Sequence, residues 1–412
     1  MTLVFWISAG LLTYTLIVYP ALMWLASLGC RRATAAAPFE LPTVTLIIPA
    51  HNEEVVLAAK LANTQQLAYP TDKLDVLVVS DGSSDRTCEI AKQSANAGIR
   101  LLDLQPNRGK ASALNAGVAE SRGDVLCLCD ANVMFRPDAL SRMVQRLADP
   151  AVGAVSGDVQ LASDESDFEA GESGYYSIER RLQLGESWLG SMMGVDGGMY
   201  VIRRELFKML PADTLLDDFA TSMNVLQQGK KIAYEPAATA TENGTPSWRQ
   251  EFRRRVRVNH GAFQSVCRGL WPLWRRPVEL WQYVSHKPLR WFGPIWLVLL
   301  LASSAALWNA GWFYRAALIG QVLFYVAAGL AWVSPGVRAH RFCGLAFYFT
   351  MSHVAMFVGL WKGMFTRPTG VWQRTERSPV AALRTNPPDV APGENEIQTP
   401  SPRTVPTASA TN

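Results

Sequence analysis

Short apolar stretches alternate with polar, helix-like stretches between residues 43 and 160. The apolar stretches are rich in β-branched residues and end in acidic or polar side chains, which is typical of buried parallel strands. Because open sheets of this class bind ligands where strand ends converge, those polar ends predict a binding site. Strands are predicted at 43–49, 74–80, 99–103, 124–129 and 152–159, and helices near 54–67, 85–96, 110–120 and 138–147.

The apolar pattern also predicts membrane segments on either side of this sheet. Residues 3–29 are nearly uncharged and long enough to cross a bilayer. Arg31 and Arg32 follow this stretch rather than precede it, which favours a retained anchor over a cleaved secretory signal. Three further apolar segments lie near 291–309, 313–333 and 342–363.

Five regions are therefore predicted along the chain. The soluble α/β region becomes less regular after residue 161, with an amphipathic helix near 168–190 and another helix starting near Leu216. Interleaved Trp and Arg residues before the later apolar segments favour helices lying in the membrane interface, and a solvated linker helix is the alternative. The regions are an N-terminal transmembrane anchor (1–30), a soluble domain (43–262), amphipathic interface helices (263–290), C-terminal transmembrane helices (291–363) and a disordered tail (378–412).

Composition fits a mixed protein, since 49% hydrophobic residues are many for a soluble chain and few for a bundle of transmembrane helices. The net charge of +4 gives no reason to expect a nucleic-acid partner, and the six scattered cysteines show no zinc spacing. Basic residues at 31–32 and 250–290 place the soluble domain in the cytosol. Three later crossings would leave the C-terminus outside, whereas Lys362 and the arginines after it favour the inside, so topology stays open between a re-entrant segment and a failure of the charge rule.

Acidic side chains follow two predicted strands, and a polar loop follows a third. Pro49-Ala50-His51-Asn52-Glu53-Glu54 ends the first strand, Asp81 closes the second, and Asp130-Ala131-Asn132 follows a later one. Their expected convergence at one edge of the sheet predicts a site for a nucleotide and a divalent cation.

The order of these motifs resembles that of the inverting family 2 glycosyltransferases with a GT-A fold, from about Val44 to about Arg377. The likeness is strongest to membrane-embedded polysaccharide synthases, such as those that make cellulose, hyaluronan, poly-N-acetylglucosamine or chitooligosaccharides. It implies an α/β, Rossmann-like GT-A domain in the cytosol, held to the cell (inner) membrane by several helices. It also implies transfer of a hexosyl or N-acetylhexosaminyl group from a nucleotide-diphospho-sugar, a UDP-sugar in particular, to a growing exopolysaccharide.

The resemblance assigns five residues to the sugar-nucleotide donor. Ala50 and Glu53 match the family's first nucleotide-contacting loop, and Asp81 matches the acid that contacts the base; a helix cap is the alternative role for Asp81. Lys110 enters a helix after a basic turn, where it and the backbone amides would face the nucleotide's negative charge. Arg257 matches the family's arginine that faces the diphosphate.

The resemblance also assigns a metal site and a base. Asp130 and Asn132 stand where the family has its Asp-x-Asp motif for Mg²⁺ or Mn²⁺, although Asn132 brings an uncharged oxygen. Asp218 matches the catalytic base, and crowding by Asp217 would raise the pKa of one of the two carboxyls. The plainer alternative is a pair of acids in the first turn of a helix.

The acceptor side departs from the family pattern. Gly197 and Gly198 match an acceptor-side loop, and Asp217 is assigned to the same side. Processive members carry Gln-x-x-Arg-Trp where this chain has Arg254 and Val258 in place of Gln and Trp. Because that Trp stacks beneath the acceptor sugar, its loss puts chain elongation in doubt; Trp188 and Trp248 are other sources of a stacking surface.

Two alternative functions remain open. One is transfer of a single sugar to a lipid carrier, and the other is a non-catalytic membrane sensor that binds a sugar nucleotide. A dehydrogenase is disfavoured because no Gly-x-Gly-x-x-Gly turn follows the first strand. The expected partners are a nucleotide-sugar donor, a polysaccharide or lipid-linked acceptor, membrane lipids and an accessory membrane subunit. The sequence identifies neither the sugar nor its linkage.

Overall fold

The computed structural model describes residues 1–29, 39–162, 167–243, 247–366, 368 and 370. The predicted tail at 378–412 and the basic residues after Gly370 lie outside this part of the chain, as do Arg31 and Arg32.

An eight-stranded mixed sheet forms the centre of the domain, with the strand order β3-β2-β1-β4-β7-β6-β8-β5. The first four strands in this order are parallel to one another, as the alternating pattern predicted. The strands are β1 (Val44–Ala50), β2 (Leu74–Asp81), β3 (Ile99–Leu104), β4 (Val125–Cys129), β5 (Met134–Phe135), β6 (Val152–Ala162), β7 (Met199–Arg203) and β8 (Lys231–Asn243).

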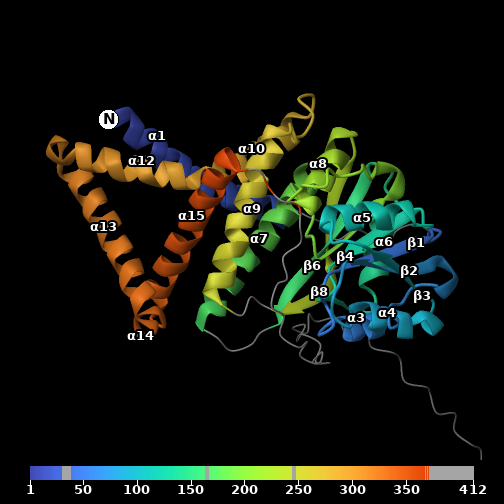
Figure 1. The fold of residues 1–412 in the computed structure, drawn as a ribbon. Helices are drawn as coiled ribbons and strands as arrows, with labels where there is room; N and C mark the ends of the chain where they lie inside the picture. The colour runs from blue at the N-terminus through green and yellow to red at the C-terminus, as the bar shows by residue number, and fades with distance from the viewer. Residues whose placement is uncertain (30–38, 163–166, 244–246, 367, 369, 371–412) are drawn as a thin grey trace, which may run out of the picture. The chain divides into compact units, whose positions relative to one another are not determined.

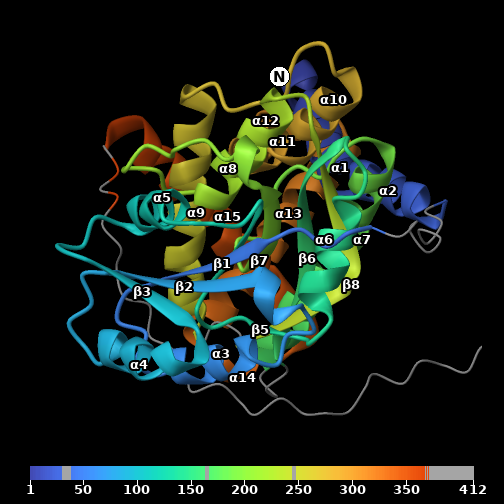
Figure 2. The same ribbon diagram turned by 90° about the vertical axis from the view of Figure 1, so that its right-hand side faces the viewer.

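Helices cover both faces of this sheet (Figure 2). Along β1, Leu46 and Ile48 join one buried cluster while Ile47 joins another, because neighbouring strand residues point to opposite faces. The first cluster includes side chains of α3, α4 and α6, and the second includes side chains of α5, α8, α9 and α10. The helices of this region are α3 (Leu57–Thr64), α4 (Thr87–Gln93), α5 (Lys110–Ala119), α6 (Ala139–Arg146), α7 (Asp167–Leu189), α8 (Asp217–Gln227) and α9 (Trp248–Cys267), with short 3₁₀ turns at Thr71–Lys73, Ala95–Ala97 and Arg204–Leu206.

The second half of the sheet departs from a purely parallel arrangement. Strand β7 runs antiparallel to both β4 and β6, and β5 runs antiparallel to β8. Strand β8 had not been predicted, because its sequence contains Pro236 and a run of small and polar residues that carries little β signal. It nevertheless pairs in parallel with β6, across two irregularities of register.

Within the described part of the chain, three helical runs are long and apolar enough to cross a membrane, or four if a bent pair forms one span. The N-terminal run Thr2–Leu28 matches the predicted anchor, and α13 (Trp312–Val333) and α15 (Arg341–Phe365) match two of the later apolar segments. The remaining helices are α1 (Thr2–Thr13), a π-helical turn (Tyr14–Val18), α2 (Tyr19–Leu28), α10 (Pro277–His286), α11 (Pro288–Trp291), α12 (Gly293–Ala306), a 3₁₀ turn (Trp308–Ala310) and α14 (Pro335–Arg338).

The first of the three later apolar segments is shorter than expected. Helix α12 has 14 residues, and the α10–α11 segment joins it at a bend of 61°. At 1.5 Å per residue α12 is about 21 Å long, less than the hydrocarbon thickness of a bilayer. It is therefore either half of a broken span or part of a re-entrant loop.

Helix α9 links the sheet to the apolar helices and runs through the boundary predicted at residue 262. It packs along α15 (Figure 1), where Arg255 donates to the Tyr348 hydroxyl and Asn259 donates to the carbonyl of Met356. After α15 the chain returns to the domain, since the carbonyl of Gly370 occupies the space that a side chain on Gly109 would need.

Candidate active site

Asp81 organises one end of the site. It closes β2, and its two carboxylate oxygens accept the backbone N–H groups of Arg108 and Gly109 at 2.8 and 2.7 Å. These two amides, expected to face the nucleotide, are therefore bonded to Asp81 instead. Asp81 fixes the turn that leads into Lys110 at the start of α5.

Ala50 is the last residue of β1, and Glu53 lies in the loop that follows, next to this turn. Both are buried, and the loop is tied to the one after β2 because the Glu53 N–H donates to Thr87 Oγ1 at 2.9 Å. A ring nitrogen of His51 also lies 2.7 Å from the carbonyl oxygen of Asp81. The first two strand ends thus form one rigid edge.

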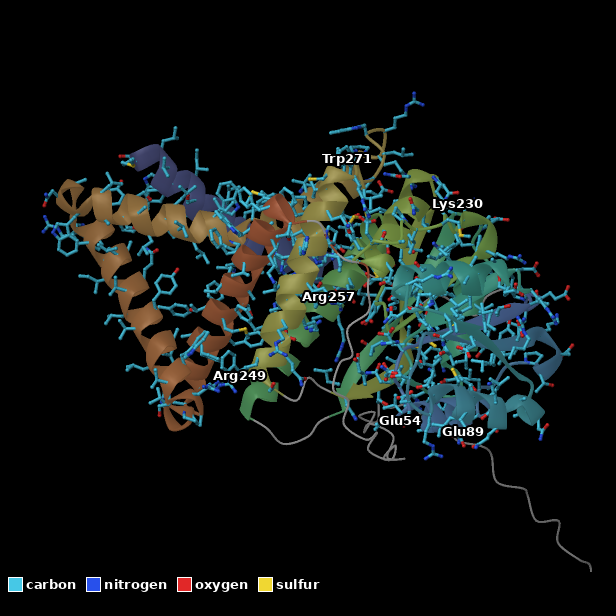
Figure 3. All side chains as sticks on the ribbon, in the orientation of Figure 1. Glu54, Glu89, Lys230, Arg249, Arg257 and Trp271 are labelled. Carbon is cyan, nitrogen blue, oxygen red and sulfur yellow. The ribbon has the colours of Figure 1, made fainter. Side chains whose placement is uncertain are left out.

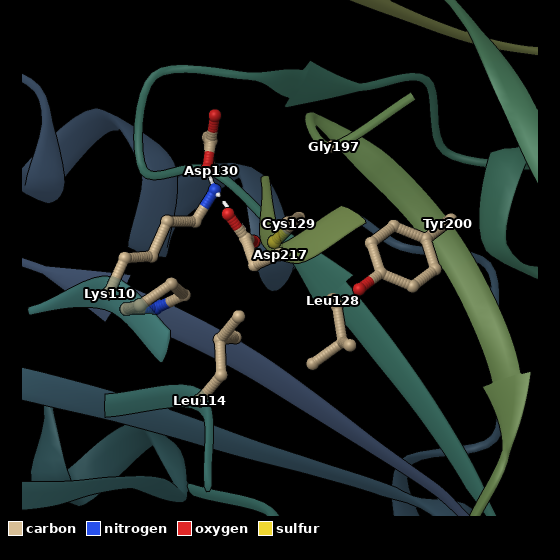
Figure 4. A pocket seen from close by; sticks show the side chains of 9 residues that line it. Lys110, Leu114, Leu128, Cys129, Asp130, Gly197, Tyr200 and Asp217 are labelled. Atoms are coloured by element: carbon tan, nitrogen blue, oxygen red, sulfur yellow. Dashed lines mark hydrogen bonds and ion pairs between the residues drawn. The ribbon is translucent and has the colours of Figure 1, made fainter. Parts of the chain in front are cut away.

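Lys110 stands between two carboxylates (Figure 4). Its Nζ lies 2.8 Å from Asp130 Oδ1 and 3.3 Å from Asp217 Oδ2. Burial opposes the charged amine, but these carboxylates outweigh it and raise the pKa of Lys110 above its usual range. The three side chains line a single pocket together with Gly197 and Tyr200.

Asp217 and Asp218 lie in the first turn of α8, where the helix dipole favours negative charge. This is the position that the alternative interpretation of the two acids predicted. Asp218 also faces the Gly197-Gly198 turn: a Cβ built on Gly197 would lie 3.0 Å from Asp218 Oδ2. Burial and the neighbouring Asp217 raise the pKa of Asp218 to about 6, against the lowering effects of Lys110 and Arg257. Such a carboxyl is suited to accept a proton near neutral pH.

Asn132 carries a polar atom without a partner. Its side chain is 5% exposed; Nδ2 donates to Glu242 Oε1 at 3.0 Å, whereas Oδ1 has no hydrogen-bond partner in the described structure. The buried Lys60 stabilises the loop that carries Asn132, because its ammonium group donates to the carbonyl of Val133 at 2.5 Å. Within the described residues, no three His, Cys, Asp or Glu side chains form a group arranged to hold a metal.

Asp196 belongs to the site and had not been singled out from the sequence. Burial and the carboxylates of Glu242, Asp218 and Asp130 raise its pKa to about 7, although a hydrogen bond from the N–H of Gly198 acts in the opposite sense. The signal in the sequence was an acid directly before the Gly197-Gly198 pair. The Asp130 N–H in turn donates to the Gly198 carbonyl at 3.3 Å, so this turn joins the two halves of the site.

The α9 side of the site supplies Arg257, which is exposed and lies on the helix between the sheet and the apolar helices (Figure 3). Arg254, which replaces the family's Gln, is paired with the buried Glu251 at 2.6 Å. Trp248 packs edge-on against Trp332 and a phenylalanine of α15, so its ring contributes to packing between helices. Of the two tryptophans considered for stacking, Trp188 is the exposed one.

Residues 45–210 match the sequence family described as "Glycosyl transferase family 2". Over these residues the chain resembles the family 2 glycosyltransferases. This stretch includes the strand-end motifs of Asp81 and Asp130, Lys110 and the Gly197-Gly198 turn, while Asp218 and Arg257 lie after it.

Two curated proteins are similar to just over half of the chain. "Probable glycosyltransferase YdaM" of Bacillus subtilis (strain 168) is 33% identical over 236 residues, which are 54% of this chain and 56% of that protein. "Poly-beta-1,6-N-acetyl-D-glucosamine synthase" of Staphylococcus aureus (strain COL) is 27% identical over 235 residues, 56% of this chain and 57% of that protein. The chain thus spans just over half the length of these relatives.

A solved structure resembles both the sheet domain and the helical region. The mannosyltransferase PcManGT from Pyrobaculum calidifontis, in complex with GDP-Man and Mn²⁺, superimposes with a TM-score of 0.68 at 24% identity. The match covers 88% of this chain and 99% of that one. The fold is therefore a GT-A fold with a mixed α/β sheet, accompanied by helices long and apolar enough to span a membrane.

Proposed function

We propose that this protein is an inverting, membrane-bound glycosyltransferase that adds a sugar from a UDP-sugar to a growing exopolysaccharide. The observation that carries the proposal is the cluster in which Lys110 contacts both Asp130 and Asp217, with Asp218 beside the Gly197 turn. A group that holds a diphosphate and a group that accepts a proton thus lie beside one another. The similarity to a poly-N-acetylglucosamine synthase supports a polysaccharide product and an N-acetylhexosamine donor.

Asp218 is the proposed base. It removes the proton from an acceptor hydroxyl, whose oxygen attacks the anomeric carbon from the face opposite the leaving group. The new C–O bond forms as the bond to the nucleoside diphosphate breaks, and the proton stays on Asp218. A pKa of about 6 keeps most of this carboxyl ionised at neutral pH and able to accept that proton.

The donor is proposed to lie along the rigid edge formed by the first two strand ends. Ala50, Glu53 and Asp81 would contact the nucleoside, with Asp81 using lone pairs beyond those that already accept backbone N–H groups. Lys110 and Arg257 would face the diphosphate, because both side chains lie near enough to Asp218 to lower its pKa. Two fixed cations at the leaving group stabilise the charge that develops there.

The residues present also fit a divalent cation, Mg²⁺ or Mn²⁺. Asp130 and the partnerless Oδ1 of Asn132 would hold it, and the crowded carboxylates around Asp196 give the site the negative potential that a cation relieves. When bound, the ion neutralises charge on the departing diphosphate. Asp196 is proposed to keep the Gly197-Gly198 turn against Asp130 through its bond to the Gly198 N–H.

The proposed location is the cell (inner) membrane, with several crossings and a cytosolic catalytic domain. Gly370 contacts Gly109 and Ala212, so the segment directly after α15 lies on the side of the domain. That requires an even number of crossings after α9, and the short, bent α12 is the segment best suited to be re-entrant. This arrangement accommodates the basic residues near the C-terminus, which the charge rule places inside. An accessory membrane subunit remains part of the proposal.

The test uses the full chain in lipid nanodiscs with a panel of radiolabelled nucleotide sugars, Mg²⁺ or Mn²⁺, and sizing of the products. We expect a long polymer from one UDP-sugar. The Asp218→Asn variant is expected to lose about 100- to 10,000-fold in rate while still binding donor. The matched control is Asp213→Asn, which removes a half-exposed carboxylate paired with Arg268 and should retain wild-type transfer. Near-normal transfer by Asp218→Asn would refute the assignment of the base.

A second function, transfer of one sugar to a lipid carrier, is favoured by the acceptor side of α9. Val258 offers no aromatic surface, and Arg254 is paired with Glu251 rather than placed for an acceptor. A short lipid-linked product as the sole outcome of the same assay would establish this function. Tight donor binding without turnover would instead support a non-catalytic sensor.

A further inference from the structure

Lys287 is a cation that the proposed reaction does not use. It stands between α10 and α11, just before the apolar α12, where the chain passes from the domain to the apolar helices. Its side chain is half-buried, and the ammonium group makes no hydrogen bond or ion pair with any residue of the described structure. Because withdrawing an ammonium group from water without a partner is unfavourable, such a group is a candidate for binding an anion.

Glu179 and Glu186 are the two carboxylates that attract Lys287 most, and both are bonded to other side chains. Glu179 lies 3.0 Å from His286 Nε2 and accepts from Arg290 at 3.0 Å, and Glu186 lies 2.9 Å from His286 Nδ1. Both attract Lys287 without bonding to it. Burial, together with Arg290, lowers the pKa of Lys287, and the two carboxylates offset part of this effect. They leave the three N–H donors of the ammonium group available.

The ammonium group faces the acceptor side of the proposed site. Lys287 Nζ lies 3.8 Å from the Cβ position of Gly194, and the φ of +141° at Gly194 disfavours a side chain there. The same turn continues to Gly197, which contacts Asp218, and Asp218 also attracts Lys287. Lys287 and the proposed base therefore flank one turn, while Lys110 is committed to the donor side.

The surroundings of Lys287 select the kind of anion. Phe219 lies 3.6 Å from the Cβ position of Gly194 and packs edge-on against Trp291 and beside Tyr283, and α12 follows directly. These three rings are buried and fill the space behind the turn. A molecule with an anion at Lys287 and a hydroxyl at Asp218 would extend its remaining bulk towards the apolar helix α12, where Val298 is exposed. A sugar joined through phosphate to a long lipid has all three parts, whereas a water-soluble phosphate lacks the apolar one.

We propose that Lys287 binds the phosphate or diphosphate of a lipid-linked sugar acceptor and thereby selects acceptors attached to a lipid carrier. This inference rests on the proposed glycosyl transfer and narrows its acceptor class. It applies equally to the first sugar added to a carrier and to a chain that grows while attached to one.

The test compares acceptors that differ only in the phosphate. The full chain in nanodiscs of zwitterionic lipid is given its donor with either polyprenyl-diphosphate N-acetylglucosamine or the octyl glycoside of the same sugar. Lys287→Gln should raise KM for the diphosphate acceptor about 10- to 100-fold, the value of a charge-assisted bond. It should leave KM for the octyl glycoside and the slow hydrolysis of donor unchanged. Lys287→Arg should keep most of the affinity, and Arg275→Gln, an exposed charge of the same segment, should behave as wild type.

Several outcomes would overturn the inference. Equal loss with both acceptors would indicate a structural role, and no change with either would remove Lys287 from the acceptor site. If a lipid-free sugar diphosphate bound as tightly as the polyprenyl one, the site would recognise phosphate alone. If Lys287→Gln mattered only in anionic nanodiscs, the ligand would be a bulk headgroup. A wild-type protein that releases no nucleotide diphosphate from any donor would instead refute the glycosyl transfer itself.

Discussion

Lys110 Nζ lies 2.8 Å from Asp130 Oδ1 and 3.3 Å from Asp217 Oδ2, so one ammonium group joins the end of β4 to the first turn of α8. This link crosses from the proposed donor site to the proposed base, since Asp218 is the next residue. Lys110 also lowers the pKa of Asp218. The electrostatic state of the base therefore depends on a residue that would contact the departing diphosphate.

Replacement of Lys110 by methionine should affect both ends of this link. We expect kcat/KM to fall about 100-fold, as when a fixed group that stabilises developing negative charge is removed. Without the cation the pKa of Asp218 should rise, so the acidic limb of the pH profile should move to higher pH. Steady-state kinetics across the pH range measure both effects. Lys110→Arg is the control that keeps the charge, and an unshifted limb in Lys110→Met would show that the two sites are not coupled.

The acid limb itself should report Asp218. Its folded-state pKa of about 6 lies above the ordinary value, so the base is protonated and inactive below that pH. We expect half-maximal kcat/KM near pH 6 and a fall of about tenfold per pH unit below it. Asp217→Asn removes a carboxylate that raises this pKa, so its limb should move to lower pH. The surface variant Asp213→Asn should leave the limb in place; a shift there would mean that another group is being titrated.

Gly109 and Gly98 offer a matched pair of backbone tests. Both have positive φ, +92° and +77°, but nothing lies within 4 Å of the Cβ position of Gly98, whereas Gly370 blocks that of Gly109. Alanine at Gly98 should cost only conformational strain, about 1 kcal/mol. Alanine at Gly109 should cost more strain, because φ of 92° with ψ of 159° is a conformation open essentially only to glycine, and it should also displace Gly370 and disturb the amide that binds Asp81. Thermal unfolding and donor KM measure the difference, and equal effects in both variants would argue against the Gly370 contact.

The sequence predicted the parallel half of the sheet well, because its strands are uniformly apolar and end in polar residues. It could not reveal that the amides after Asn107 bond to Asp81, since that contact depends on how closely two loops approach. Strand β8 was not predicted for a related reason. Its own sequence pattern is weak, and it forms a strand because it pairs with β6.

The candidate site divides in the same way. Asp130, Asp217 and Asp218 stood in recognisable motifs, and the structure brings them around Lys110. Asp196 and Lys287 stood in no recognisable motif. Their surroundings in the site are made by charged residues that are far away in the chain. A lone acid before two glycines and a lone lysine after an interfacial helix are too common to be informative until their surroundings are known.

Asn132 offers a test of the proposed cation site. An asparagine oxygen is an uncharged ligand, so Asn132→Asp should bind Mn²⁺ more tightly, by about tenfold, because it adds a charge to the ligand set. Asn132→Ala should weaken binding, and chelation should abolish transfer in every variant. Titration of Mn²⁺, followed by both calorimetry and activity, separates metal affinity from turnover. Full transfer by the wild type after exhaustive chelation would refute the metal requirement.

The position of Gly370 predicts the membrane topology. Since it contacts Gly109 and Ala212, the end of α15 must lie on the same side of the membrane as α9. Cys267 at the end of α9 and Thr366 after α15 are both exposed. A Thr366→Cys variant with its other cysteines replaced by serine should therefore react with a membrane-impermeant maleimide only in inside-out vesicles. The matched control is a variant that keeps Cys267 as its single cysteine. Labelling of the two positions from opposite sides would mean that all three later apolar segments cross the bilayer, so that Gly370 could not reach the domain.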